Sequence, residues 1–317
     1  MRAVVIREFG PPEVLEPAEV AEVRAGPDEV VIGVEFANVT FVETQVRAGR
    51  PPHPSMLPAL PAILGNGVGG TVNDSSPWSG LQVVASLNGT GGYAERAVTS
   101  ASQLIRVPDG LATRDAVALL ADGRTALALA ARADLRTGET VLIEAAGGGV
   151  GTLLVQIARN AGARVVALAG HPRKLALARD LGADLTVDYR HDGWERQVRD
   201  ATGQVDVVFD GVGGDIGLAA FGLLRAGGRF CPFGMASGSF TAVTPEHAAA
   251  WRISLRSGAA ASPEELAALA RTALTEGAAG RLRPVVGQEF ELAEAAAAHA
   301  AIEARETIGK TLLTVPR

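Results

Sequence analysis

Residues 140–151 read TVLIEAAGGGVG, and this stretch decides how the fold is interpreted. A run of glycines alone fits either a flexible linker between two halves of the chain or a loop shaped to hold a phosphate. Here an apolar, strand-like segment runs straight into the glycines, and the residues after them have the apolar spacing of an amphipathic helix. This order of strand, glycines and helix is the context that a dinucleotide-binding loop requires.

The small residues of this loop each have a physical task. Ala146 permits a tight turn, Gly148 lets the backbone approach a pyrophosphate, and Gly151 lets the following helix pack closely on the strand. The first turn of that helix offers free N–H groups and the positive end of its dipole to the phosphates. The sequence therefore predicts that this loop binds a dinucleotide.

The choice between NADH and NADPH depends on a position about 20 residues beyond the loop. NAD-binding folds usually have Asp or Glu there, which binds the ribose 2′-hydroxyl. This chain has Gly170, followed by Arg173 and Lys174. The missing carboxylate removes a repulsion, and the two cations supply charge-assisted hydrogen bonds to a 2′-phosphate. We therefore predict NADPH; the alternative is that both cations only cover the solvated first turn of a helix.

Composition limits the remaining functions. Of the 317 residues, 47% are hydrophobic and 20% are charged, and the net charge of −6 favours neither nucleic acid nor an anionic membrane as a partner. We expect neither a membrane span nor a signal peptide, because no apolar run is long enough. Cys231 is the only cysteine, so an internal disulfide is excluded and a cytoplasmic location is expected. The five histidines lack metal-ligand spacing, so no metal site is expected.

Two kinds of segment divide the chain. The first third has short Val-rich runs separated by Gly, Pro, Asn and Ser, which is typical of an antiparallel β barrel or sandwich. From about residue 113, strands and helices alternate, which predicts a parallel sheet wound by helices on both faces. The tail after residue 258 fits either domain.

Segments spread along the whole chain are similar to those of one family. They include RAGRPP (47–52), GGYAERAVTSASQLIRVPDGL (91–111), EAAGGGVG (144–151), LGADLTVDYR (181–190) and GKTLLTV (309–315). In this order and spacing, the chain resembles the medium-chain dehydrogenase/reductases, specifically the zinc-free quinone oxidoreductase (zeta-crystallin-like) branch.

The resemblance implies an α/β fold with two domains. A Rossmann domain, a doubly wound parallel sheet that binds NADPH, would span residues 116–257. A GroES-like β-rich substrate domain would comprise residues 1–115 and 258–317. The resemblance also implies a homodimer paired through the strand at 228–234, and a small hydrophobic substrate in the cleft between the domains.

The resemblance further implies which residues bind the cofactor. A threonine lies near the nicotinamide, a tyrosine lines the adenosine phosphate, and backbone after two strands orients the carboxamide. The matching residues are Thr125, Gly148, Gly149, Val150, Gly170, Arg173, Lys174, Tyr189, Val212, Phe233, Gly234 and, as the weakest match, Lys310.

The substrate half departs from the family pattern. Asn66 and Gly67 stand where the zinc-dependent branch has His and Glu, so a family-type catalytic zinc is not expected. In the stretch TFVETQ, Thr40, Glu43 and Gln45 replace the Asn, Asp and Tyr that face the substrate in quinone oxidoreductases. These three are the candidate catalytic residues. We expect Thr40, assisted by Gln45, Arg47 or a water molecule, to donate to an oxyanion, while Glu43 either relays a proton or fixes the loop.

These features predict a zinc-independent, NADPH-dependent reductase. Its acceptor would be a conjugated carbonyl compound, either an α,β-unsaturated ketone or enoyl C=C, or a quinone. The replaced family tyrosine favours the enone. Two alternatives stay open: a quinone oxidoreductase proper, and a non-catalytic NADPH-binding protein of the crystallin-like or RNA-binding kind.

Overall fold

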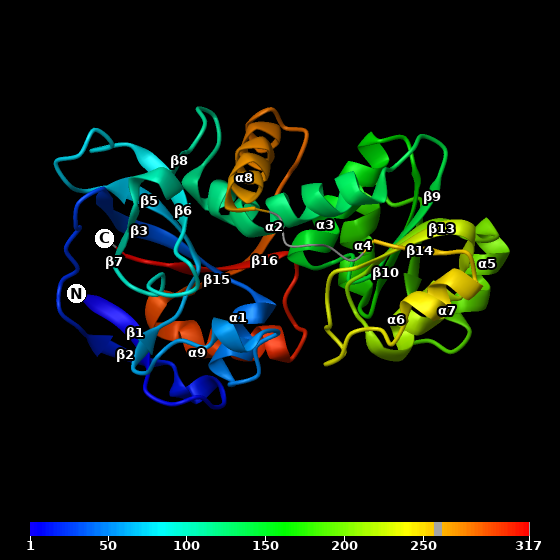
Figure 1. Cartoon of the computed structure of the whole chain (residues 1–317), viewed down its shortest axis with the longest axis horizontal. Coiled ribbons are helices and arrows are strands. Elements are labelled where there is room, and N and C mark those ends of the chain that lie inside the picture. Colours follow the sequence, from blue (N-terminus) through cyan, green and yellow to red (C-terminus); the bar gives the residue numbers. More distant parts are fainter. Residues whose placement is uncertain (257–261, 317) are drawn as a thin grey trace. The chain divides into compact units, whose positions relative to one another are not determined.

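The chain forms two compact units (Figure 1). The computed structural model describes residues 1–256 and 262–316. Unit 1 comprises Met1–Gly123 together with Ala270–Arg317, and unit 2 comprises Arg124–Leu269. The C-terminal segment therefore packs with the N-terminal part of the chain.

Two helices run across the unit boundaries. They are α2 (Thr113–Ala133) and α8 (Pro263–Ala278). The predicted domain limit at residue 115 falls near the start of α2, and the predicted limit at residue 258 lies outside the described residues. A continuous helix carries no loop signal where one unit ends, so the sequence gives no mark of these boundaries.

Short strands make up most of unit 1. Val30, Ile32 and Val34 lie on one face of its longest strand and are buried, because side chains alternate across a strand. The strands are β1 (Arg2–Ile6), β2 (Glu16–Glu19), β3 (Glu29–Val39), β4 (Ala62–Ile63), β5 (Gly67–Val72), β6 (Gln82–Ser86), β7 (Arg96–Ser100), β8 (Ile105–Arg106), β15 (Val286–Glu291) and β16 (Lys310–Thr314).

The strands of unit 1 form two sheets, and helices complete the unit. The larger sheet has the order β15-β16-β3-β5-β6-β8, with β7 also paired to β3, and the smaller has the order β2-β1-β4. Except for the parallel pair of β15 and β16, the pairings are antiparallel, as predicted for this part of the chain. The helices include α1 (Phe41–Arg47) and α9 (Ala295–Glu303), with short 3-10 turns at Pro12–Val14, Pro54–Met56, Ala101–Gln103 and Leu292–Glu294.

Unit 2 alternates strands and helices. In the part of the chain that the structure describes, no helix is both long and apolar enough to cross a membrane. The strands are β9 (Thr140–Ile143), β10 (Arg164–Ala169), β11 (Leu185–Asp188), β12 (Val205–Asp210), β13 (Leu224–Pro232) and β14 (Ser254–Leu255), and the helices are α3 (Gly149–Asn160), α4 (Pro172–Asp180), α5 (Trp194–Thr202), α6 (Gly214–Phe221) and α7 (Pro245–Ala250).

The sheet of unit 2 is parallel and doubly wound. Its order is β11-β10-β9-β12-β13-β14, so the order reverses between β9 and β12. Ligands of such sheets bind beyond the carboxyl ends of the strands at this switch point, which is where the glycine loop follows β9. The predicted fold class, a Rossmann domain with a β-rich second domain, is confirmed.

The strand expected to pair two subunits has neighbours on both sides. β13 pairs with β12 on one side, and Arg229 and Phe230 pair with β14 on the other. The last strand of the sheet order is β14, and the pairing of two subunits through residues 228–234 stays a prediction. β14 has only two residues, too few for a recognisable sequence pattern.

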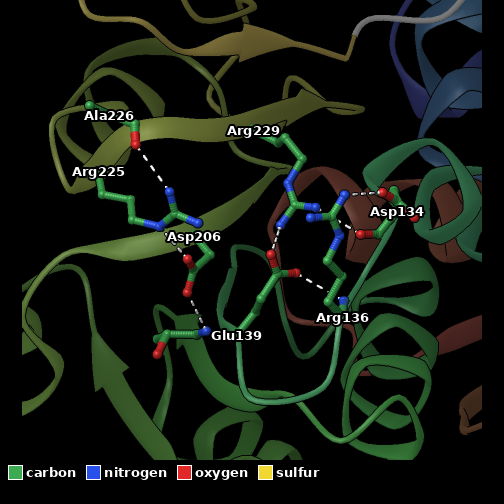
Figure 2. Close-up of polar contacts among 8 residues, drawn as sticks. Asp134, Arg136, Glu139, Asp206, Arg225, Ala226 and Arg229 are labelled. Atoms are coloured by element: carbon green, nitrogen blue, oxygen red, sulfur yellow. Dashed lines mark hydrogen bonds and ion pairs between the residues drawn. The ribbon is translucent and has the colours of Figure 1, made fainter.

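Ion pairs fasten the sheet near the amino ends of its strands (Figure 2). Arg229 of β13 donates to the Glu139 carboxylate just before β9, and Arg225 donates to Asp206 of β12. Asp206 also accepts the N–H of Thr140, the first residue of β9, at 2.7 Å. These contacts tie three neighbouring strands together at the ends opposite to the glycine loop.

Candidate active site

The glycine loop has the geometry predicted from its sequence. Gly148 is the N-cap of α3, in extended conformation. A Cβ atom at Gly151 would lie 2.2 Å from the backbone oxygen of Ala145, so only glycine lets the helix approach the strand this closely. A Cβ at Gly148 would meet only the same oxygen, at 3.3 Å, so that side of the loop is open. This open side and the helix N-terminus fit a pyrophosphate.

Residues predicted to bind the 2′-phosphate gather beside this loop. The side-chain stem of Lys174 packs on Gly147, where an added Cβ would lie 2.5 Å from Lys174 Cβ. At Gly170, an added Cβ would lie 3.0 Å from ring atom Cε2 of Tyr189. The structure therefore brings Lys174 to the loop and Tyr189 to Gly170, as a 2′-phosphate site requires.

The first turn of α4 presents Arg173. Its side chain is exposed, and its backbone N–H donates to Nδ1 of His171 at 3.2 Å. His171 is the N-cap of α4 and was absent from the predicted site. The sequence contains one indication of this cap: Pro172 favours the first position of a helix, so the residue before it is expected to be the N-cap.

A nearby carboxylate is neutralised within the protein. The Asp188 side chain, at the end of β11, accepts hydrogen bonds from the Arg190 guanidinium at 2.7–3.2 Å. These bonds lower the pKa of Asp188 below its usual value, more than its burial raises it. Asp188 therefore adds little net repulsion for a phosphate bound near Tyr189, which follows it in sequence.

The loops after β12 and β13 are joined to each other. The N–H groups of Phe233 and Gly234 donate to the backbone oxygen of Asp210, at 2.8 and 3.2 Å. The N–H of Val212 donates to the carboxyl groups of Glu144 and Asp210, at 3.1 and 3.2 Å. Both predicted carboxamide-orienting segments are thus held by buried groups at the carboxyl ends of the strands.

Two other predicted cofactor residues, Thr125 and Lys310, do not belong to the loops described above. Thr125 is a half-buried residue within α2, in unit 2. Lys310 is buried in unit 1, and its Nζ lies 3.1 Å from Asp122 Oδ1. The Lys310 ammonium is therefore engaged in an ion pair, so a cofactor contact by this residue stays a prediction.

The stretch TFVETQ begins a helix. Thr40 is the N-cap of α1 and forms a capping box with Glu43: the N–H of Glu43 donates to Thr40 Oγ1 at 3.3 Å, and that of Thr40 donates to Glu43 Oε2 at 2.6 Å. The Thr40 hydroxyl also lies 3.0 Å from Glu43 Oε2. Gln45 donates to the Thr44 hydroxyl at 3.1 Å.

Glu43 connects the two stretches that depart from the family. Its Oε1 accepts the N–H of Asn66 at 2.7 Å, so residues 40–45 (TFVETQ) and residues 64–70 (LGNGVGG) meet at this carboxyl group. Burial raises the pKa of Glu43 above its usual value, although the Asn66 N–H and the charge of Lys310 act in the opposite direction. The Glu43 carboxyl group is thus both an anchor and a group poised to hold a proton.

A buried tyrosine and histidine support Glu43. The Tyr93 hydroxyl lies 3.0 Å from His299 Nε2 and forms a hydrogen bond with Glu43. Burial lowers the pKa of His299 to about 3, so its imidazole is neutral. Burial also raises the pKa of Tyr93, and the Glu43 charge raises it further. Sequence reasoning missed His299, which stands 206 positions from Tyr93 with no local signal that joins them.

Replacing Tyr93 with phenylalanine should destabilise the protein by about 1–3 kcal/mol, since Glu43 and His299 would each lose a buried hydrogen-bond partner. The change keeps the ring volume, so no cavity contributes to the loss. Chemical denaturation of wild type and variant measures the free energy of unfolding. A loss below about 0.5 kcal/mol, the usual effect of a neutral surface change, would contradict this network.

The described residues show no cluster of three or more His, Cys, Asp or Glu side chains that could hold a metal ion. Cys231 lies buried on β13, and burial raises the pKa of its thiol to about 12. Its thiolate is therefore scarce at neutral pH, and the residue packs as a small apolar side chain.

Known proteins are similar to this chain over nearly its whole length. The family described as zinc-binding dehydrogenase matches residues 149–275. A quinone oxidoreductase of Pseudomonas aeruginosa is 33% identical, covering 96% of this chain and 97% of its own length. A 2-haloacrylate reductase of Burkholderia sp is 32% identical, covering 98% of each chain. The crystal structure of Escherichia coli quinone oxidoreductase complexed with NADPH superposes with a TM-score of 0.89, at 26% identity, covering 99% of this chain and 100% of that one.

Proposed function

The chain belongs to the zinc-free quinone oxidoreductase branch of the medium-chain dehydrogenase/reductase superfamily and is an NADPH-dependent oxidoreductase, and we propose that it reduces a conjugated carbonyl compound. The observation that carries the proposal is the Thr40–Glu43 pair, a hydroxyl 3.0 Å from a buried carboxyl group, in the stretch matching the family's substrate-facing residues. A homodimer, a cytoplasmic location and an acceptor bound between the domains stay predictions.

We favour an enone or enoyl acceptor over a quinone. The 2-haloacrylate reductase, whose name denotes reduction of a conjugated C=C compound, supports this choice. The quinone oxidoreductases among the relatives support the other acceptor. A panel of simple quinones and enones with NADPH separates the two: faster turnover of enones is expected, and turnover of quinones alone would reverse the order.

The cofactor fits the residues of unit 2. The open side of Gly148 takes the pyrophosphate, Lys174 and Arg173 bind the 2′-phosphate, and the loop at Val212 faces the nicotinamide end. When bound, NADPH supplies a hydride. The protein then has to bind the acceptor, stabilise the negative charge that develops on its oxygen, and deliver a proton.

Thr40 and Glu43 meet these last two needs. When Glu43 is protonated, its O–H donates to Thr40 Oγ1, and the Thr40 hydroxyl turns to donate to the acceptor oxygen. A proton then passes from Glu43 through Thr40 to that oxygen, and Glu43 regains a proton from solvent. The hydride and this proton together complete a two-electron reduction. From an enone they give an enol, which then tautomerises to the saturated carbonyl compound. Gln45 assists as a second donor to the acceptor.

Two substitutions test this relay. Thr40→Val and Glu43→Gln should each lower kcat by about 100-fold, because general acid catalysis contributes roughly that factor or more. Activity should be present while Glu43 is protonated and fall as pH rises through its raised pKa, and Glu43→Gln should remove this dependence. Steady-state kinetics over pH measure both effects.

Thr40→Ser is the matched control, since it keeps both the hydroxyl and the helix cap. It should retain most of kcat. NADPH affinity should be equal in all variants, because Thr40 and Glu43 are not among the residues predicted to bind the cofactor. Equal kcat for Thr40→Val and wild type would rule out the relay while leaving NADPH binding untouched.

A further inference from the structure

Two acidic side chains lie buried at the switch point of the sheet in unit 2. Glu144 follows β9 and Asp210 ends β12, and both are 0% exposed. The two strands are neighbours, and the Glu144 N–H donates to the backbone oxygen of Phe209 at 3.0 Å. Two carboxyl groups thus share one dry site at the carboxyl edge of the sheet, next to the glycine loop.

The hydrogen bonds of this pair account for all but one carboxyl oxygen. Asp210 accepts the N–H of Gly213 at 2.7 Å and of Val212 at 3.2 Å through Oδ1, and the Thr241 hydroxyl at 2.5 Å through Oδ2. Glu144 Oε2 accepts the Val212 N–H at 3.1 Å. Glu144 Oε1 is buried without a donor among the described residues. An ionised Glu144 with this buried oxygen unpaired would destabilise the folded protein, whereas a protonated Glu144 would donate a hydrogen bond to Asp210.

We propose that Glu144 is a neutral carboxylic acid that donates to Asp210, and that this pair positions the Val212–Gly213 loop for the nicotinamide. The proposal rests on the proposed function, which places the nicotinamide at that loop. Glu144 and Asp210 are positioning residues, because they act through the N–H groups of Val212 and Gly213.

The surroundings of the pair support a single shared proton. Two adjacent carboxylates in a dry site cannot both ionise near neutral pH. Burial, and then the charge of Asp210, raise the pKa of Glu144 well above its usual value. From the other elements the pair meets the Val212 and Gly213 amides and the Thr241 hydroxyl, which do not titrate in the physiological range. Asp210 is thus the titratable group that faces Glu144.

The helix after the loop is shaped around the Asp210 carboxylate. A Cβ atom at Gly217 of α6 would lie 2.9 Å from both Asp210 carboxylate oxygens and 1.9 Å from Thr241 Oγ1. Any larger residue at this position would displace the groups that hold Asp210. The segment after β9, helix α6 and the Thr241 loop therefore converge on a small site with room for one carboxylic acid and one carboxylate.

This arrangement makes nicotinamide binding depend on a proton. Because the pKa of Glu144 is raised well above its usual value, the neutral form is present below the raised pKa and is lost as pH rises through it. Ionisation would then place two anions side by side and remove the hydrogen bond between them. The Val212–Gly213 loop would shift, while the 2′-phosphate site at Lys174 would keep its geometry.

The test compares two ligands from neutral to alkaline pH by calorimetry or fluorescence titration. The affinity for NADPH depends on the whole site. The affinity for adenosine 2′,5′-bisphosphate, which lacks the nicotinamide, depends only on the part that binds the adenosine and its phosphates. For wild type, we expect NADPH affinity to fall at least tenfold at alkaline pH, with the bisphosphate changing much less. Glu144→Gln, which donates but cannot ionise, should abolish the difference between the ligands.

Glu246→Gln on exposed α7 is the matched control, and it should keep the wild-type profile. Bisphosphate affinity confirms that each variant is folded. Identical NADPH profiles for wild type and Glu144→Gln would overturn the proposal, as would an equal alkaline loss for both ligands. Failure of wild type to bind NADPH at neutral pH would instead overturn the proposed function, so the two failures are distinct.

Discussion

Replacing both Arg173 and Lys174 with alanine should weaken NADPH binding by about 100-fold or more and leave NADH binding nearly unchanged. Each cation supplies a charge-assisted hydrogen bond to the 2′-phosphate, worth about 1.5–3 kcal/mol, and about 1.4 kcal/mol equals a factor of ten. NADH lacks that phosphate. Titration of both cofactors against each variant measures the change.

Lys174→Met sharpens this test. Methionine keeps the apolar stem that packs on Gly147 and removes only the charge. It should therefore lose NADPH affinity by about tenfold or more with little change in stability. Arg196→Ala, an exposed cation on α5, is the control and should leave both affinities as in wild type. An equal loss of NADH and NADPH affinity in Lys174→Met would show that Lys174 does not bind the 2′-phosphate.

Replacing Gly151 with alanine should mainly lower stability, whereas replacing Gly148 with alanine should mainly lower NADPH affinity. Gly151→Ala should destabilise unit 2 by about 1–3 kcal/mol or more, because its Cβ would meet the Ala145 backbone oxygen at 2.2 Å and backbone cannot turn aside. Gly148→Ala should destabilise the protein much less, because its Cβ has one neighbour within 4 Å, the same backbone oxygen at 3.3 Å. It should nevertheless lower NADPH affinity by about 100-fold, since the methyl group occupies the side that the pyrophosphate approaches.

Thermal unfolding and cofactor titration of both variants measure these effects. A stable Gly151→Ala protein would mean that the helix does not approach the strand as closely as the structure shows. A Gly148→Ala protein with wild-type NADPH affinity would mean that the phosphates lie elsewhere. The two variants thus separate the structural task of the loop from its binding task.

Local signals were enough to predict the cofactor half of the molecule. The spacing of Gly148 and Gly151, and the pairing of Gly170 with Lys174, are short-range features that follow from strand, turn and helix geometry. The structure places the stem of Lys174 against the loop, and its binding of the 2′-phosphate stays a prediction. Thr40 and Glu43 also show a local signal, the T-x-x-E capping box, which gives them a helix-start role besides the proposed chemistry.

Contacts between distant residues could not be predicted in this way. Tyr93 meets His299, and Glu144 meets Asp210, only because the sheets bring separate strands and helices together. Without an alignment or a structure, nothing in the sequence links the members of either pair. The strand β14 beside β13 could not be predicted either, since its two residues are too few to show a pattern.

The central claim is that this protein passes hydride from NADPH to a conjugated acceptor. The most direct measurement is turnover of an enone with NADPH that carries deuterium at the transferable position of the nicotinamide, followed by mass spectrometry of the product. The account predicts a saturated carbonyl product with one deuterium on the carbon β to the carbonyl. NADPH that binds but is never oxidised by enones or quinones, or a reduced product without the label, would contradict it.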